Sequence, residues 1–384
     1  MSYDVDALRR EEFPWAAAGE TIYLNNASTG PLPQRTVRVL DEWSRLRANP
    51  DRVPQDLQFG TLARAREQLA RLVGADASEI ALATNTSYGL NLAAFALPLR
   101  AGDVVLTPDS EFPANVYPWM ALAQRRGIEY RRLKCHEGVL DADRLAHELE
   151  DERVRLVSVS WVQFASGARV DLAALGALCR ARGVYFVVDA IQGVGPLTLD
   201  LSTTPVDILA CGAQKWLLSP WGSGFVYVRR ALIEEVEPYD VSWLAVRGAD
   251  DFTRLTDYDL TWRADARRFE FITLPYQDMA GLNASLELLH ALGPAAISAH
   301  VLALADAIVD WASARGDVAL VTPAHPTRRG GIVSVRPSDA RAASARLAAA
   351  NVAHSLREGA IRLSPHLYNT RDEIERALAL VVGD

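Results

Sequence analysis

A lysine and an aspartate lie in sequence settings where each could take part in chemistry. Lys215 lies in the largely apolar segment 207–224, just after an expected strand, and is one of only two lysines in an arginine-rich chain. Removal from water favours the neutral amine, which attacks an aldehyde to form a Schiff base. Asp189 directly follows the apolar run 185–188. Ligands bind at the carboxyl ends of strands in an open parallel sheet, so we expect both residues at one site.

Each residue also has an ordinary interpretation. A lone lysine is usually solvated, and a lone aspartate is usually a helix cap or a loop acid. Together, however, Lys215 and Asp189 are the pair that pyridoxal phosphate (PLP) requires, namely an amine for its aldehyde and an acid that keeps its ring nitrogen protonated. A dinucleotide site is not predicted, because the Gly193-x-Gly195 pair lacks a third glycine and is followed by Pro196.

A phosphate-binding turn is expected in the segment 84–91, Thr-Asn-Thr-Ser-Tyr-Gly-Leu-Asn. Hydroxyl and backbone N–H groups at the start of a helix bind phosphate, and Thr86 and Ser87 are placed to do so. Taken alone, such residues are usually plain helix caps. The Lys215 and Asp189 pair is what makes a phosphate site the better interpretation.

These residues give the chain a resemblance to the class V aminotransferases, a PLP-dependent family of fold type I that includes cysteine desulfurases, kynureninases and isopenicillin-N-epimerase-like proteins. The resemblance runs from Tyr23 nearly to the end, and it is most specific at Asp189-x-x-Gln192, at Lys215 and at the segment 361–364, Ile-Arg-Leu-Ser. It implies that Lys215 forms the internal aldimine, that Asp189 pairs with the pyridine nitrogen, and that Gln192 bonds the ring 3′-oxygen.

The resemblance implies further cofactor contacts. Phe112, in Glu-Phe-Pro-Ala-Asn at 111–115, would stack on the ring, although an aromatic residue there is otherwise most often core. Gln214 replaces the usual histidine and would bind phosphate, whereas Gly212 stands where relatives often have serine. Thr273 matches a residue that reaches the phosphate of the partner subunit. This match implies a homodimer with active sites at the subunit interface.

The resemblance also implies the substrate class. Arg362 matches the arginine that binds the substrate α-carboxylate, for which a bidentate guanidinium is suited, unless it is a plain surface arginine. Asn26 is a second candidate to face the substrate. The expected enzyme acts on an α-amino acid through an external aldimine and Cα deprotonation, and aminotransferase is the leading assignment. A carbon–sulfur β-lyase and an isopenicillin-N-epimerase-like activity remain alternatives.

Two other activities are disfavoured. A persulfide-forming cysteine desulfurase needs a cysteine shortly before the carboxylate-binding arginine, and the segment 347–355 has none. A non-catalytic PLP-binding protein would be expected to lack Lys215 or Arg362. His354 remains either a second acid–base group or a structural residue. A group of three aromatic residues could wall the substrate pocket or anchor the dimer, namely Trp243, Tyr258 and Trp262.

The elements that must position these residues follow from the hydrophobic pattern. Strand-like apolar runs alternate with helix-period segments, which predicts an α/β fold with a mainly parallel sheet between helices and a smaller C-terminal α/β domain. The large-sheet strands are expected at 80–84, 104–107, 128–133, 156–160, 185–188, 207–210 and 224–228. We expect an N-terminal segment that packs on the small domain, a large PLP-binding domain and a small C-terminal domain, at residues 1–20, 21–270 and 271–384.

Composition limits the partners and the location. The 384 residues, 49% of them hydrophobic and 23% charged, are typical of a globular protein. A net charge of −8 provides no attraction to nucleic acid or to an anionic membrane. The three unclustered cysteines indicate reduced thiols, and the histidines show no metal-ligand spacing. Without a signal peptide or an apolar run of membrane-spanning length, we expect a metal-free cytoplasmic protein.

Overall fold

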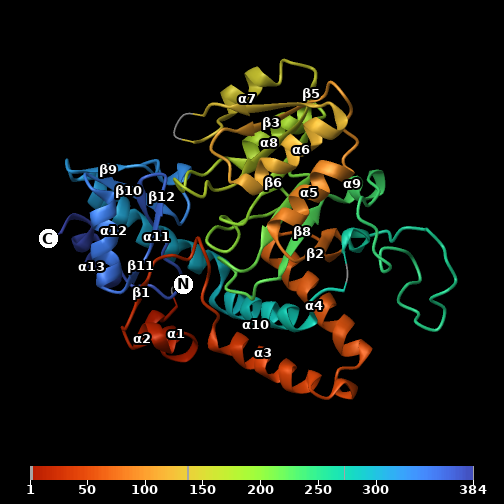
Figure 1. Ribbon diagram of the computed structural model, residues 1–384, viewed down its shortest axis with the longest axis horizontal. Coiled ribbons are helices and arrows are strands. Elements are labelled where there is room, and N and C mark those ends of the chain that lie inside the picture. The colour runs from red at the N-terminus through yellow and green to blue at the C-terminus, as the bar shows by residue number, and fades with distance from the viewer. Residues whose placement is uncertain (1–2, 136–137, 272, 384) are drawn as a thin grey trace.

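The computed structural model describes residues 3–135, 138–271 and 273–383. Two sheets organise the chain, a seven-stranded sheet in the larger part and a four-stranded sheet toward the C-terminus (Figure 1). A short parallel pairing of β1 (Ile22–Tyr23) with β11 (Val352–Ala353) ties the N-terminal segment to the C-terminal part.

The large sheet has the strand order β2-β8-β7-β6-β5-β3-β4. Only β8 runs antiparallel to its neighbours, so β2, β3, β5, β6 and β7 all end at the same edge. This sheet confirms the predicted fold class and every strand expected in it. The strands are β2 (Ile80–Ala83), β3 (Val104–Pro108), β4 (Glu129–Leu133), β5 (Val154–Ser160), β6 (Tyr185–Asp189), β7 (Ile208–Gly212) and β8 (Gly224–Val228).

Helices cover both faces of the large sheet. Successive strand residues point to opposite faces, so Val104 and Phe186 join one core cluster while Val105 and Val187 join the other. The first cluster contains residues of α4 (Gln55–Val73), α7 (Ala142–Glu148), α8 (Leu172–Ala181) and α10 (Tyr276–Leu292). The second contains residues of α5 (Thr86–Ala96), α6 (Tyr117–Arg126) and α9 (Arg230–Glu235). The sheet is therefore sandwiched between helices.

Side-chain caps set the starts of several helices. Asp141 accepts a hydrogen bond from the Arg144 N–H at the start of α7, and Asp171 does the same for Ala174 in α8. The last helix, α13 (Arg371–Val382), begins with a capping box. These caps end the preceding loops at defined residues and so fix where each helix packs on its sheet.

The C-terminal sheet is antiparallel, with the order β12-β13-β10-β9. Its strands are β9 (Val318–Leu320), β10 (Val333–Pro337), β12 (Ser355–Arg357) and β13 (Ala360–Leu363). It shares a core cluster with α11 (Pro294–Ser313), α12 (Ala340–Ala349) and α13. Helix α11 is long and apolar enough to cross a membrane, but Leu304, Ile308 and Val309 bury its apolar face in this cluster. We therefore interpret it as a core helix.

The N-terminal helices α1 (Val5–Glu12) and α2 (Pro14–Ala17) lie beside the C-terminal segment. Arg9 donates to the Tyr368 carbonyl oxygen at 3.0 Å and forms an ion pair with Glu373 at 2.7 Å. Helix α10 follows the predicted domain boundary at residue 270, yet it packs mainly on α3 (Gln34–Arg47) and α4 beside the large sheet. The domain limits themselves stay a prediction.

Candidate active site

A cavity of about 340 Å³ lies at the carboxyl edge of the large sheet. Its walls come from the ends of the parallel strands, from the N-terminal segment and from the β12–β13 hairpin. The fold brings eight of the ten predicted site residues to this cavity, namely Thr86, Ser87, Phe112, Asp189, Gln192, Gln214, Lys215 and Arg362. The remaining two, Asn26 and Thr273, are not among its lining residues.

Lys215 follows β7 and enters the cavity from the sheet edge. Burial lowers the pKa of its amine from 10.5 to about 8, and the positive charge of Arg362 adds to the effect, while Asp189 opposes it. Its Nζ lies 5.8 Å from the ring centroid of Phe112. The geometry therefore gives a lysine with a large neutral fraction at mildly alkaline pH.

Asp189 is the last residue of β6 and is 3% exposed. Burial raises the pKa of its carboxyl group to about 7, and the nearby Glu111 carboxylate adds to this shift. A hydrogen bond from the Ile191 N–H, at 3.1 Å, and the Lys215 amine act in the opposite direction. A buried carboxylate with so few partners suits a cationic ligand group, because such a group offsets the cost of burial.

Gln192 is held in one orientation by two neighbours. Its Nε2 donates to the Ala27 carbonyl oxygen at 3.0 Å, and its Oε1 accepts from the Trp216 indole N–H at 2.7 Å. The amide nitrogen carries two hydrogens, so one N–H remains for a ligand oxygen. The contact with the ring 3′-oxygen that the resemblance implied stays a prediction.

The start of α5 forms the other end of the cavity. Helix α5 begins at Thr86, and the N–H groups of its first turn lack helical partners. Thr86 Oγ1 accepts from the Gly212 N–H at 2.9 Å, which joins this helix to the strand that precedes Lys215. The side-chain Oε1 of Gln214 is buried and has no hydrogen-bond partner among the described residues. The N–H groups at the start of α5 suit a phosphate, whereas the Gln214 oxygen is an acceptor and calls for a hydrogen-bond donor.

Arg362, on β13, closes the side of the cavity nearest the C-terminal sheet. It is 2% exposed and donates to the Phe164 carbonyl oxygen at 2.7 Å and to Ser28 Oγ at 2.8 Å. Its buried Nε has no partner in the described part of the chain. Burial lowers the pKa of this guanidinium to about 10, and the positive charge of Arg357 contributes. A buried donor left unpaired in this way fits an anionic ligand.

The Asn26 side chain has two hydrogen-bond partners within the chain, and its predicted contact with the substrate stays a prediction. Its side-chain nitrogen donates to the Lys215 carbonyl oxygen at 3.3 Å, and its oxygen accepts from the Tyr368 hydroxyl at 3.0 Å. Asn26 thus holds the backbone of Lys215 in place. Thr273 is exposed and lies outside the cavity, so its predicted contact with a partner's phosphate stays a prediction.

Sequence reasoning missed a buried carboxylate next to Phe112. Glu111 accepts hydrogen bonds from the Ser160 N–H at 2.8 Å, from Gln163 Nε2 at 2.9 Å and from Asn115 Nδ2 at 2.9 Å, and it also bonds the Ser160 hydroxyl. Burial raises the pKa of its carboxyl group. This network fixes the Phe112 loop to the end of β5. The signal that could have revealed this buried acid was its place directly before Phe112-Pro113, in a loop that follows a strand.

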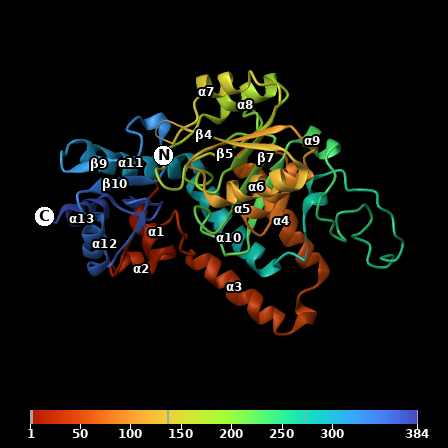
Figure 2. The same cartoon turned by 45° about the horizontal axis from the view of Figure 1, so that its top comes forward.

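The positions of residues within one subunit bear on two questions that the sequence left open. Both ring nitrogens of His354 are engaged, at 2.7 Å with Ser344 Oγ and at 2.8 Å with the Val352 carbonyl oxygen, and this histidine does not line the cavity. It is therefore a structural residue. The aromatic residues that could have walled the pocket lie away from the Lys215 cavity, on the segment between α9 and α10 that extends from the body (Figure 2). They are Trp243, Tyr258 and Trp262.

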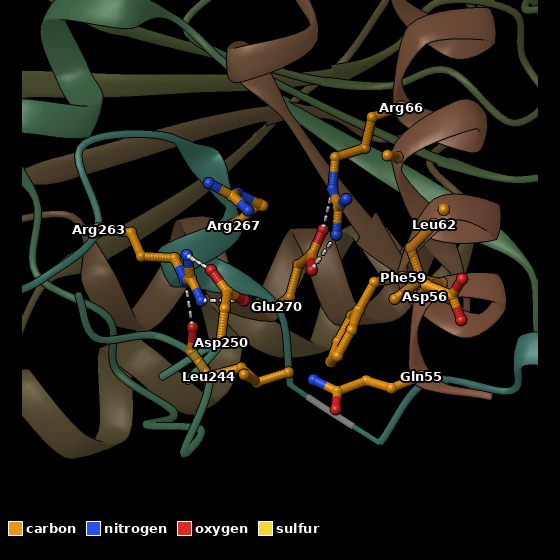
Figure 3. Close-up of a pocket in the computed structure, with 12 residues that line it drawn as sticks. Gln55, Asp56, Phe59, Leu62, Arg66, Leu244, Asp250, Arg263, Arg267 and Glu270 are labelled. Carbon is orange, nitrogen blue, oxygen red and sulfur yellow. Dashed lines mark hydrogen bonds and ion pairs between the residues drawn. The ribbon is translucent and has the colours of Figure 1, made fainter. Parts of the chain in front are cut away.

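A larger hollow of about 690 Å³ lies between α4 and that extended segment (Figure 3). Its main charges are already paired. Arg66 bonds Glu270 at 2.6 Å, and Arg263 bonds Asp250 at 2.7 Å. Glu270 also accepts from the Leu82 N–H at 2.9 Å in β2. We interpret this hollow as the anchored base of the extended segment rather than as a second active site.

The donor set of the Lys215 cavity fits PLP. An amine, a buried carboxylate, an amide N–H, an aromatic ring and a helix start are arranged around one cavity, and the buried Arg362 Nε is a donor without a partner among the described residues. The sequence model of the family described as aminotransferase class-V matches residues 22–377. The chain belongs to this family. Its cofactor is PLP.

Relatives with different activities share most of the chain. An isopenicillin N epimerase from Streptomyces clavuligerus is 33% identical over 94% of this chain and 95% of its own length. A probable cysteine desulfurase from Methanothermobacter thermautotrophicus is 32% identical over 73% of this class-V chain and 69% of its own. A solved mutant of C-DES, with glycine covalently linked to its PLP cofactor, superposes with a TM-score of 0.88 at 25% identity, covering 97% and 98% of the two chains.

Proposed function

We propose that this protein is an aminotransferase that acts on an α-amino acid. One observation carries the proposal: Lys215 is the only amine in the cavity, and no histidine, cysteine, tyrosine or glutamate is among the described lining residues. A single base suits a reaction in which one group removes the Cα proton and delivers it again on the same face of the substrate. Transamination has this form, whereas epimerisation needs a proton donor on the opposite face.

Different residues of the cavity bind the cofactor, orient the substrate and remove the proton. When bound, PLP supplies an aldehyde for an amino group and a ring that withdraws electrons from Cα. Arg362 binds the α-carboxylate and so orients the Cα–H bond, and Lys215 takes the proton from Cα. Asp189 would pair with the ring nitrogen of bound PLP, and Phe112 would hold the ring by stacking. These roles rest on position, burial and charge at the cavity.

Persulfide chemistry is disfavoured by the C-terminal hairpin. The strands β12 and β13 are joined by the two residues Glu358 and Gly359, both with positive φ. A turn this short leaves no mobile loop beside Arg362 that could carry a cysteine. No cysteine is found among the described residues that line the cavity.

Two other reactions are the competing candidates. The 33% identity with an isopenicillin N epimerase favours epimerisation as the second candidate. The likeness to C-DES, which is described as a cystine C–S lyase, supports β-elimination as a further one. All three reactions share the removal of the Cα proton, so they differ only in the later steps.

One experiment separates the three reactions. The holoenzyme is incubated in D₂O with a panel of L-amino acids, with and without an α-keto acid, and the products are followed by NMR and chiral chromatography. We expect a new keto acid whose formation depends on the acceptor. A D-enantiomer that carries deuterium at Cα, without keto acid, would instead establish epimerisation. Acceptor-independent formation of pyruvate, ammonia and cysteine persulfide from cystine would establish β-elimination. Lys215→Ala is the inactive control. Lys134→Ala, which replaces the other lysine at an exposed position, is the matched control and should keep activity.

We further propose a cytoplasmic homodimer with the partner's Thr273 at the phosphate end of each cavity. Thr273 is exposed, and the nearby extended segment exposes Tyr239, Trp243 and Tyr258. Exposed aromatic residues of this kind are typical of interfaces. The ion pairs of Glu270 and Arg263 hold the base of this segment in place.

Mixed subunits test this arrangement. A Lys215→Ala chain and a Thr273→Ala chain are each purified, combined and allowed to exchange. If threonine acts across the interface, one site of each hybrid dimer regains both intact residues, so activity rises above that of either variant alone. No gain in verified hybrids, or a monomeric wild-type protein by sedimentation, would contradict the proposal.

A further inference from the structure

The cavity holds a second arginine that the proposed function does not use. Arg357, the last residue of β12, lines the same cavity as Arg362 but is exposed toward solvent. Its one hydrogen bond is to the adjacent Leu356 carbonyl oxygen at 3.2 Å, and no acid pairs with it in the described part of the chain. An unpaired guanidinium at the rim of a binding cavity is available to a ligand.

The hairpin geometry aims this arginine into the cavity. Ser355 lies opposite Arg362 in the β12–β13 ladder, and Arg357 lies two residues after Ser355. Because side chains at i and i+2 share one face of a strand, Arg357 and Arg362 share a face. They are diagonal neighbours across the ladder, a separation of about 7–8 Å.

The turn keeps Arg357 in this place. Glu358 and Gly359 have φ values of 45° and 73°, which is the pattern of a tight two-residue hairpin turn. The Arg336 guanidinium, from the neighbouring strand β10, donates to the Glu358 carbonyl oxygen at 3.3 Å. The backbone of Arg357 is therefore held between a short turn and a ladder, and only its side chain is free to adjust.

The charges around the cavity are out of balance. Lys215, Arg357 and Arg362 bring three positive groups to its lining, and Asp189 is the only carboxylate there among the described residues. Repulsion from Arg357 contributes to the lowered pKa values of Arg362 and Lys215. The phosphate of PLP would add negative charge at the start of α5, the other end of the cavity. At the hairpin end, one α-carboxylate satisfies Arg362 but leaves Arg357 without a counter-charge, and Asp189 would pair with the ring nitrogen.

We propose that Arg357 binds a second anionic group on the side chain of the substrate, so that this enzyme acts on acidic α-amino acids, whose side chains end in a carboxylate or another oxyanion. Arg362 takes the α-carboxylate and Arg357 takes the distal anion. A guanidinium binds an oxyanion through two parallel N–H bonds, which gives the site both affinity and a preferred side-chain length. This inference rests on the proposed function, because it names the side chain of the same substrate.

Binding of unreactive acids tests the proposal apart from turnover. The holoenzyme is titrated with glutarate and succinate and, for comparison, with butyrate and propionate at constant ionic strength, and the change in its visible spectrum is recorded. We expect the dicarboxylates to bind about 10- to 100-fold more tightly than the monocarboxylates. In Arg357→Gln that ratio should fall to about one, and Arg357→Lys should keep part of it.

Arg341→Gln is the matched control, because it removes one exposed positive charge on α12, away from the cavity lining. It should keep the wild-type ratio. An equal loss of affinity for both classes of acid in Arg357→Gln would show that Arg357 serves the α-carboxylate or the phosphate, and would overturn the proposal. So would an unchanged ratio, or a wild-type enzyme without a dicarboxylate preference. Because the ligands do not react, a failed aminotransferase assignment would leave these binding results standing.

Discussion

Gly30 lies directly against the backbone of Lys215. Its N–H donates to the Gln214 carbonyl oxygen at 2.9 Å, and a Cβ added to Gly30 would collide with the Lys215 carbonyl oxygen. Asn26 donates to that same carbonyl oxygen from the same segment. The N-terminal segment therefore sets the position of the reactive lysine, although nearly two hundred residues separate them in sequence.

Substitution of Gly30 by alanine should displace the lysine. The atom that a new methyl group meets is backbone, which cannot rotate away, so the Lys215 segment has to shift. A misplacement of this kind is expected to slow covalent attachment of PLP to the apoenzyme by at least about tenfold. Stopped-flow absorbance measures the rate. Gly60→Ala in α4, where a Cβ meets nothing within 4 Å, is the control and should match the wild type.

Loss of the Lys215 amine should remove the covalent bond to the cofactor. Lys215→Ala is expected to lose the borohydride-sensitive absorption band and to lower turnover by about 10²- to 10⁴-fold, the range of a general base. Lys134→Ala should keep both properties, since Lys134 is exposed and does not line the cavity. A borohydride-sensitive band in Lys215→Ala would contradict the assignment.

Cofactor attachment should depend on pH through the Lys215 amine. Only the neutral amine attacks an aldehyde, and burial lowers its pKa to about 8. The rate of attachment to apoenzyme is therefore expected to rise about tenfold per pH unit below 8 and to level off above it. With an ordinary lysine, the rate of attachment would continue to rise with pH up to the pKa of 10.5. A rate that still rises between pH 9 and 10 would argue against a desolvated amine.

Removal of the Glu111 carboxylate should destabilise the protein. Glu111→Ala leaves the Ser160 N–H and the side-chain amides of Asn115 and Gln163 without their acceptor. Each buried donor left unpaired costs about 1–3 kcal/mol, so the free energy of unfolding should fall by about 3 kcal/mol or more. Urea unfolding measures it. Glu287→Ala, which removes an exposed ion pair with Arg64, should cost less than about 1 kcal/mol.

Local signals in the sequence were sufficient to predict the strands, the helix starts and the residues at the ligand edge of the sheet. Buried strands such as β6 are continuous apolar runs, and an acid at the end of such a run in a parallel sheet must lie at the ligand edge. That reasoning located Asp189 and Lys215, and the family pattern supplied Gln192 and Arg362. The helix starts were predictable for the same reason, because a cap such as Asp171 acts on the next three residues alone.

The long-range contacts were decided by the tertiary structure. The hydrogen bond from Asn26 to the Lys215 carbonyl oxygen was not predicted, because the direction of a loop side chain depends on what packs against it. The predicted contact of Asn26 with the substrate stays a prediction. Glu111 was not recognised as a buried acid, since its partners Ser160 and Gln163 come from a distant strand end.

The sequence by itself thus determined the α/β fold, the family, the cofactor and the lysine, because each depends on a residue type at a short spacing. Only the tertiary structure decided how these groups are held and what remains unpaired. It placed Arg357 beside Arg362 through a tight turn and a strand register, and it left the Arg362 Nε and the Gln214 side-chain oxygen without partners among the described residues. The physical reason is that burial, charge balance and unsatisfied hydrogen bonds depend on which distant segments meet.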